Sequence, residues 1–176
     1  MEKVILNGIV NIINENKELL GIPLRQKAKF EGWLKFELAF YLEKIGLESV
    51  EVESPVGEKR ERTDITFICN GKPYSIELKT SNTNWRIEGV NPMGRPITKN
   101  IKSIIHDVNK LKTDNGIVAF VLFPIPVGDS RWESYLRRIT ESTGVALDKE
   151  RNCRIVTINI DEKNSCDMIV CVFTSK

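Results

Sequence analysis

The pattern of hydrophobic and polar residues predicts an α/β protein. Apolar side chains recur at helical spacing in four segments, so we expect helices over residues 3–20, 27–45, 98–112 and 129–142. Alternating or continuous apolar runs predict strands over residues 49–53, 62–69, 73–79, 117–125, 154–160 and 168–173. We expect Gly21-Ile22-Pro23 to end the first helix, because proline breaks helical hydrogen bonding. The middle of the chain therefore reads helix, three strands, helix, strand.

The helix expected over residues 27–45 has two apolar stripes. One contains Phe30, Leu34 and Leu38, and the other contains Phe36 and Phe40 together with Trp33. A helix that is apolar on two sides is expected to pack between layers instead of lying on the surface.

A tight hairpin places three charged residues together. Asn70-Gly71 is the strongest short signal for a two-residue turn, so the flanking strands should pair antiparallel. Pairing about this turn sets Asp64 across from about Glu77. Glu77 and Lys79 share a face because residues two apart in a strand point the same way. We therefore expect two carboxylates and one ammonium on one face of the sheet.

Two adjacent carboxylates repel each other, and a hard divalent cation removes that repulsion. Mg²⁺ suits one or two carboxylates plus water and phosphate oxygens, and Mn²⁺ is expected to substitute for it. Such an ion can activate water for attack on phosphate. Lys79 could position or deprotonate the water, or stabilise negative charge on the phosphate. A structural salt bridge between Lys79 and Asp64 is the simpler alternative.

The string Asp64, twelve residues, Glu77-Leu78-Lys79 resembles the core motif of the PD-(D/E)XK nuclease superfamily, over about residues 27–125. Thr63 stands where the motif has proline. The resemblance implies a restriction-endonuclease-like three-layer α/β/α fold with a central mixed sheet and an αβββαβ core, here followed by a C-terminal helix and strands. It also implies that Asp64, Glu77 and the Leu78 carbonyl bind metal and that Lys79 is the motif lysine.

Many members of that superfamily also carry a glutamate on the preceding helix, near the metal. Glu31 and Glu37 are the two candidates in this sequence. Glu31 falls within the apolar stripe, where a carboxylate needs a partner, so we prefer Glu31 over Glu37 as a ligand. The alternative role for Glu31 is favourable interaction with the helix dipole.

Basic residues follow the motif in a long loop and the start of the next helix. Arg86, Arg95, Lys99 and Lys102 could bind nucleic-acid phosphates, or they could form a solvated basic surface. Trp85 could stack on an unpaired base, but burial beneath the loop is its expected role. The formal net charge of +2 leaves nucleic-acid binding open.

Composition narrows the remaining possibilities. With 176 residues and 41% apolar content, the chain suits one globular domain over residues 1–176. No apolar run is long enough to span a bilayer and the N-terminus does not resemble a signal peptide, so a cytoplasmic protein is expected. The four cysteines lack zinc-type spacing and are expected to be reduced thiols in or near the core.

These observations favour a Mg²⁺-dependent endonuclease acting on DNA, of the restriction type or the junction and repair type. The alternative is a catalytically inactive protein of the same fold that binds nucleic acid or a protein partner. A third interpretation is an unrelated α/β binding protein with a salt-bridged hairpin. Cutting both strands of a duplex would need two active sites, so a homodimer is a further expectation.

Overall fold

The computed structural model describes residues 1–56, 61–92, 96–111 and 115–175. Within these residues the chain forms an α/β structure with a six-stranded mixed sheet and six helices. The helices are α1 (Glu2–Glu15), α2 (Lys17–Gln26), α3 (Glu31–Lys44), α4 (Ile97–Lys110), α5 (Glu133–Thr143) and α6 (Lys149–Asn152). The strands are β1 (Glu48–Val56), β2 (Glu61–Cys69), β3 (Lys72–Asn82), β4 (Gly116–Ile125), β5 (Cys153–Asn159) and β6 (Ser165–Thr174).

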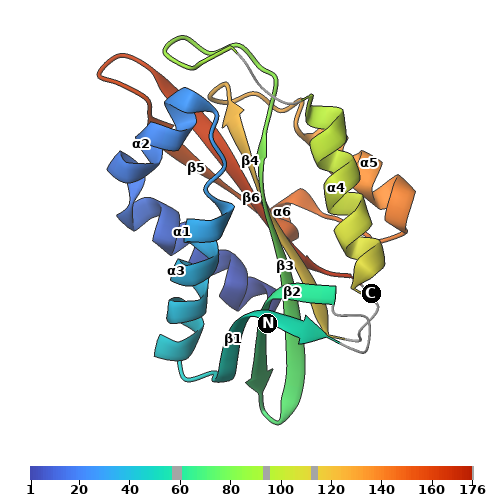
Figure 1. Cartoon of the computed structure of the whole chain (residues 1–176). Coiled ribbons are helices and arrows are strands. Elements are labelled where there is room, and N and C mark those ends of the chain that lie inside the picture. Colours follow the sequence, from blue (N-terminus) through green and yellow to red (C-terminus); the bar gives the residue numbers. More distant parts are fainter. Residues whose placement is uncertain (57–60, 93–95, 112–114, 176) are drawn as a thin grey trace.

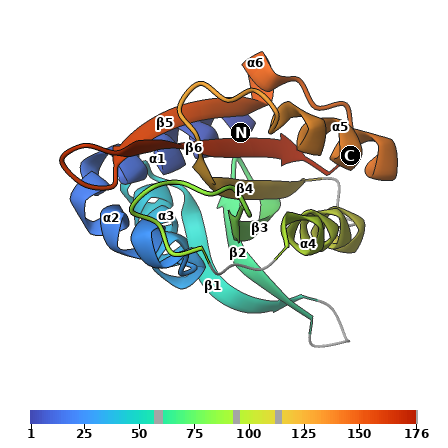
Figure 2. The same ribbon diagram turned by 90° about the horizontal axis from the view of Figure 1, so that it is seen from above.

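The strands are ordered β1-β2-β3-β4-β6-β5 across the sheet. Only β3 and β4 pair in parallel, and α4 connects them, whereas the other neighbouring pairs are antiparallel. Figure 1 shows α1, α2 and α3 in front of one face of the sheet, and Figure 2 shows α4 and α5 against the opposite face. The predicted order of helix, three strands, helix and strand is therefore present as α3-β1-β2-β3-α4-β4.

The predicted hairpin is confirmed. Asn70 and Gly71 both have positive φ, at 50° and 71°, which is the backbone geometry of a two-residue hairpin turn. Cys69 pairs with Lys72, and the register continues to Ile65 opposite Ile76. The described pairing ends there, one step before the predicted pair of Asp64 and Glu77.

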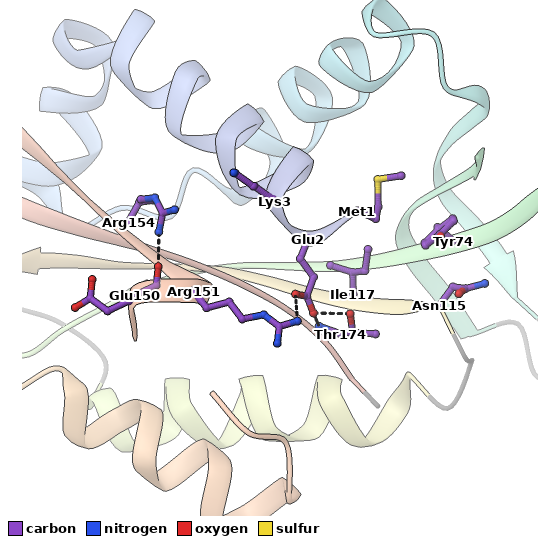
Figure 3. A pocket seen from close by; sticks show the side chains of 10 residues that line it. All are labelled: Met1, Glu2, Lys3, Tyr74, Asn115, Ile117, Glu150, Arg151, Arg154 and Thr174. Atoms are coloured by element: carbon purple, nitrogen blue, oxygen red, sulfur yellow. Dashed lines mark hydrogen bonds and ion pairs between the residues drawn. The ribbon is translucent and has the colours of Figure 1, made fainter. Parts of the chain in front are cut away.

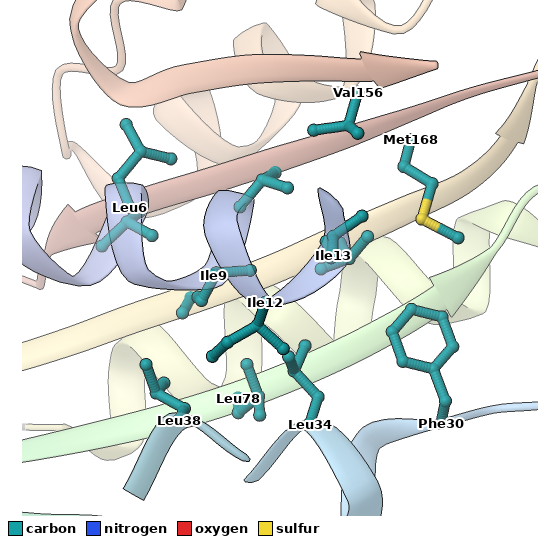
Figure 4. Close-up of a cluster of buried hydrophobic side chains, with 14 of the residues drawn as sticks. Leu6, Ile9, Ile12, Ile13, Phe30, Leu34, Leu38, Leu78, Val156 and Met168 are labelled. Carbon is teal, nitrogen blue, oxygen red and sulfur yellow. The ribbon is translucent and has the colours of Figure 1, made fainter. Parts of the chain in front are cut away.

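Side chains from both faces of the sheet fill two hydrophobic clusters. The larger cluster lies beneath α1, α2 and α3 and includes Leu34, Leu38 and Leu78 (Figure 4). The second lies beneath α4 and α5 and includes Val118 and Phe120 of β4. Every residue of β4 is buried, which confirms that residues 117–125 form a central strand.

The first helical prediction is wrong in two respects. The single helix expected over residues 3–20 is two helices, separated at Asn16, whose side-chain amide donates to the Ile12 carbonyl. Pro23 does not stop the second helix, which continues to Gln26. Proline in the second turn of α2 removes one hydrogen-bond donor and crowds the preceding turn, while Leu20 and Leu24 on either side of it are buried in the core.

The prediction for α3 is also partly wrong. The helix begins at Glu31 and not at residue 27, because Lys27 adopts a left-handed conformation with φ of 49°. The stripe that contains Leu34 and Leu38 is buried, but Phe36 and Phe40 are 65% and 63% exposed. Phe36 and Phe40 of the second stripe therefore lie on the surface, whereas Trp33 is half-buried against the core.

The cysteines and the absence of a membrane-spanning segment were also predicted from the sequence. The four cysteines are free thiols, of which Cys153, Cys166 and Cys171 are buried and Cys69 is half-buried, as expected. In the described part of the chain, the helices are all too short or too polar to cross a lipid bilayer.

Candidate functional site

The candidate site forms where β2 and β3 separate. Their pairing ends at Ile65–Ile76, while β3 continues to Asn82 with β4 on its other side. Beyond that point the Leu78 N–H donates to Asp64 Oδ2 at 2.8 Å, and the Thr80 N–H donates to Glu31 Oε2 at 3.1 Å. Two carboxylates thus take the place of a strand partner along this part of β3, since buried backbone donors need acceptors.

The side chains that gather at this opening come from four elements. We call them the acid–lysine cluster: Glu31 and Lys35 of α3, Asp64 of β2, Glu77 and Lys79 of β3, and Asp107 and Lys110 of α4. Glu77 and Lys79 lie beside Val118 and Phe120 of β4, whose side chains belong to the core beneath α4. The cluster therefore occupies the opening between β2 and β3, where side chains from both α3 and α4 reach the sheet.

Each acid of the cluster lies next to a lysine. Lys35 Nζ is 2.7 Å from Asp64 Oδ1, and Lys110 Nζ is 2.5 Å from Glu77 Oε1. Lys79 Nζ lies 3.5 Å from both Glu31 Oε1 and Asp107 Oδ2. The exposed Glu53 of β1 also contacts Lys35, at 3.2 Å. The salt bridge between Lys79 and Asp64, which was the structural alternative to a metal site, is not among these contacts, and α3 and α4 supply most of the partners.

The two motif carboxylates have different acidities. Burial alone would raise the pKa of Asp64. This effect is outweighed by hydrogen bonds from Lys35 and the Leu78 N–H and by the charges of Lys35 and Lys79. The pKa of Asp64 is therefore held below its ordinary value. The pKa of Glu77 is raised to about 7, mainly by burial. The charges of Asp64 and Asp107 raise it further, whereas the hydrogen bond and charge of Lys110 lower it. At neutral pH Asp64 is therefore ionised, and Glu77 is close to half protonated.

Lys79 is a cation in this environment. Burial disfavours its ammonium, but the charges of Asp107, Glu31, Asp64 and Glu77 outweigh burial and raise its pKa. Its ammonium also donates to the Leu78 carbonyl at 3.3 Å. Of the roles open to Lys79 from the sequence, this charge state favours stabilising negative charge over accepting a proton.

The oxygen atoms of the cluster have the chemistry that Mg²⁺ and Mn²⁺ require, because both ions bind carboxylate and carbonyl oxygen. Burial is the main cause of the raised pKa of Glu77, and the charges of Asp64 and Asp107 add to it. Among the residues that the structure describes, however, no three acidic, histidine or cysteine side chains are arranged so that they could hold a metal ion. An ion could bind to Asp64 and Glu77 only after Lys35 and Lys110 move away.

The structure brings Glu31 into the site and leaves Glu37 half-exposed elsewhere on α3. Glu31 is the candidate that the apolar stripe favours. Its side chain reaches β3 because it lies in the first turn of α3, where the helix starts beside Thr80.

The predicted phosphate-binding residues are placed only in part. Arg86, Lys99 and Lys102 are exposed, and Arg95 lies outside the described residues. Trp85 is half-buried and packs near Tyr135, with the Arg131 guanidinium 5.1 Å from the centre of its ring. That packing agrees with the expectation that Trp85 is mainly covered within the protein.

Three members of the cluster were not identified from the sequence: Lys35, Asp107 and Lys110. Lys35 follows Glu31 by one helical turn, and Asp107 lies among buried residues of α4 such as Ile104 and Val108. A polar residue within an apolar face was the signal that favoured Glu31, and the same signal applies to Asp107. Lys110 has no comparable signal, because its position near Glu77 depends on how α4 packs on the sheet.

A separate hollow lies at the start of α1 (Figure 3). Its central polar group is Glu2, whose carboxylate accepts from the Thr174 N–H at 2.7 Å and from Arg151 at 3.2 Å. These contacts attach the N-terminus to β6 and leave the Glu2 carboxylate engaged. The hollow contains no residue of the acid–lysine cluster.

Comparisons of the chain with protein-family models, with curated proteins and with solved structures found no match.

Proposed function

We propose that this protein is a metal-dependent endonuclease that hydrolyses phosphodiester bonds in DNA. The observation that carries the proposal is the convergence of Asp64, Glu77 and Lys79 at the opening between β2 and β3, where Glu31 also binds the β3 backbone. The element order α3-β1-β2-β3-α4-β4 supports the further proposal that the fold is restriction-endonuclease-like and related to the PD-(D/E)XK nucleases.

The residues are assigned the following roles. Asp64, Glu77 and the Leu78 carbonyl would hold Mg²⁺, with Glu31 as an additional ligand. The bound ion would supply an activated water and would stabilise charge on the phosphate. Lys79, held as a cation by its acidic neighbours, stabilises the negative charge that develops on the phosphate oxygens.

Basic residues along α4 support a nucleic-acid substrate. Lys99 and Lys102 are exposed and lie one turn apart, and Lys110 lies at the end of the same helix beside Glu77. At 1.5 Å per residue, Lys102 and Lys110 are separated by about 12 Å along the helix axis. This spacing would allow Lys102 to contact a phosphate of the same strand while another phosphate is bound at the cluster.

The proposal is tested by incubating purified protein with Mg²⁺ or Mn²⁺ and plasmid, junction, flap and single-stranded DNA. We expect cleavage by the wild type and by Glu37→Gln, which serves as an acid-to-amide control on α3. Asp64→Ala and Glu77→Ala should abolish cleavage while circular dichroism shows a folded protein. Wild-type activity no greater than that of Asp64→Ala would refute the enzymatic function.

The second candidate function is a catalytically inactive protein of this fold that binds nucleic acid or a protein partner. The lysine contacts at Asp64 and Glu77 favour it, because those carboxylates are already neutralised by side chains. Calorimetric titration with Mn²⁺ separates the two functions. Binding that is lost in Asp64→Ala supports the nuclease, and the absence of binding by the wild type supports the inactive protein.

A further inference from the structure

Asp107 is a buried acid that is only loosely paired, with the Lys79 ammonium 3.5 Å from Oδ2. Its side chain is 8% exposed, and Oδ2 has no hydrogen-bond partner among the described residues. Oδ1 lies 3.7 Å from Nδ1 of the exposed His106 ring. A buried carboxylate oxygen without a donor costs about 1–3 kcal/mol or more, so its retention requires a reason.

The unsatisfied oxygen lies beside the candidate site. Asp107 Oδ2 is 3.5 Å from Lys79 Nζ, the same ammonium that lies 3.5 Å from Glu31 and 3.3 Å from the Leu78 carbonyl. Charged hydrogen bonds of this kind are usually about 2.7–2.9 Å long. Three oxygen atoms therefore surround one cation at distances that are too long for strong hydrogen bonds. This arrangement leaves Asp107 Oδ2 available to a smaller cation with a higher charge.

The charge of Asp107 also acts on the motif acids. Its charge raises the pKa of Glu77, and the charge of Asp64 raises its own pKa. Burial is the first cause of both raised pKa values, and these charges add to it. Asp107 therefore adds a third negative charge beside Lys79 and the motif acids.

We propose that Asp107 is a further oxygen ligand of the divalent-cation site, supplied by α4. This inference rests on the proposed function, because it assumes that the acid–lysine cluster binds Mg²⁺ or Mn²⁺. It adds a ligand on the opposite side of the sheet from Glu31, so that the ion would be bound by residues of α3, β2, β3 and α4. An ion bound in this way would satisfy the Oδ2 atom.

Calorimetric titration of the intact protein with Mn²⁺ is the first test. Asp107→Asn keeps the shape of the side chain and removes its charge, and Glu141→Gln on the exposed side of α5 is the matched control. We expect Asp107→Asn to weaken Mn²⁺ binding at least ~10-fold, whereas Glu141→Gln should bind as the wild type does. Unchanged affinity in Asp107→Asn, with binding lost in Asp64→Ala, would overturn this inference and leave the proposed function intact. A wild type that binds no Mn²⁺ would overturn both.

A second test separates a ligand from a residue that only holds Lys79. Thiolates bind soft ions, so Asp107→Cys should gain affinity for Cd²⁺ and show an ultraviolet thiolate-to-Cd²⁺ absorption band. The wild type, with its four native thiols, and Glu141→Cys provide the baseline. Weaker Mn²⁺ binding in Asp107→Asn without a new band in a folded Asp107→Cys would show that Asp107 acts through Lys79, and would refute the ligand assignment.

Discussion

Glu77 allows a quantitative test, because its burial should make the metal-free protein less stable as the pH rises. Its side chain is 4% exposed, and its pKa is raised from 4.5 to about 7, chiefly by burial. In the unfolded chain the carboxyl returns to its ordinary pKa. The folded state therefore holds the proton more tightly, and stability is lost when that proton leaves.

The direction and size of the effect follow from this difference. The contribution of Glu77 is fully present below pH 4.5 and is lost as the pH rises through about 7. One pH unit of difference in pKa corresponds to ~1.4 kcal/mol, so complete ionisation costs on the order of 3 kcal/mol. Glu77→Gln replaces the carboxyl with a neutral group of the same size that still accepts a hydrogen bond from Lys110.

Urea unfolding in the presence of a chelator measures this cost. We expect Glu77→Gln and the wild type to have similar free energies of unfolding at pH 5, and the variant to be more stable by up to ~3 kcal/mol at pH 8. Glu37→Gln, a half-exposed residue of α3, is the control and should follow the wild type at both values. Equal pH dependence in the wild type and in Glu77→Gln would refute the reasoning that burial and neighbouring acids raise this pKa.

Three further predictions concern the cluster and the helix beside it. The affinity for Mn²⁺ should fall by up to ~10-fold for each pH unit below 7, because a proton on Glu77 competes with the ion. Calorimetry at pH 6 and pH 8 should show this difference, and equal affinities at the two pH values would contradict the prediction. Lys110→Met should bind Mn²⁺ more tightly than the wild type does. The reason is that the Lys110 ammonium, which lies 2.5 Å from Glu77 Oε1, no longer competes with the ion for that oxygen. Unchanged or weaker binding would argue against this competition. In urea titrations, Leu38→Ala should lower the free energy of unfolding by about 2–5 kcal/mol, because Leu38 is fully buried. Phe40→Ala on the exposed side of α3 should change it by less than about 0.5 kcal/mol. A comparable loss in Phe40→Ala would show that the aromatic surface is covered in solution.

Local chemistry accounts for the part of the site that the sequence predicts. The turn at Asn70-Gly71 depends on two positive φ angles that these residues adopt readily, and the turn fixes the β2–β3 register. With that register, the side-chain alternation of strands places Asp64 near Glu77 and sets Glu77 and Lys79 on one face. Each of these steps joins residues that are close in sequence.

The remaining features depend on packing between distant segments. The break at Asn16 and the surface position of Phe40 reflect how α1, α2 and α3 fit on the sheet, and helical periodicity does not encode that fit. Lys110 is similarly a surface-type residue whose ion pair with Glu77 depends on the tilt of α4. The buried Asp107 is intermediate, because its position among apolar residues of α4 is visible in the sequence but its proximity to Lys79 is not.

Charge balance links the two candidate functions. The acid–lysine cluster contains four carboxyls, Glu31, Asp64, Glu77 and Asp107, and three lysines. One negative charge is therefore uncompensated when every group is ionised, and a proton on Glu77 near pH 7 removes it. A divalent cation would replace that proton and displace a lysine, whose ammonium would then be free to contact phosphate.

In the inactive alternative, the lysines stay on the acids and the cluster only holds β3 between α3 and α4. The two functions thus differ in whether the lysines leave when Mn²⁺ is added, and lysine-selective NMR of Nζ groups would observe that change directly.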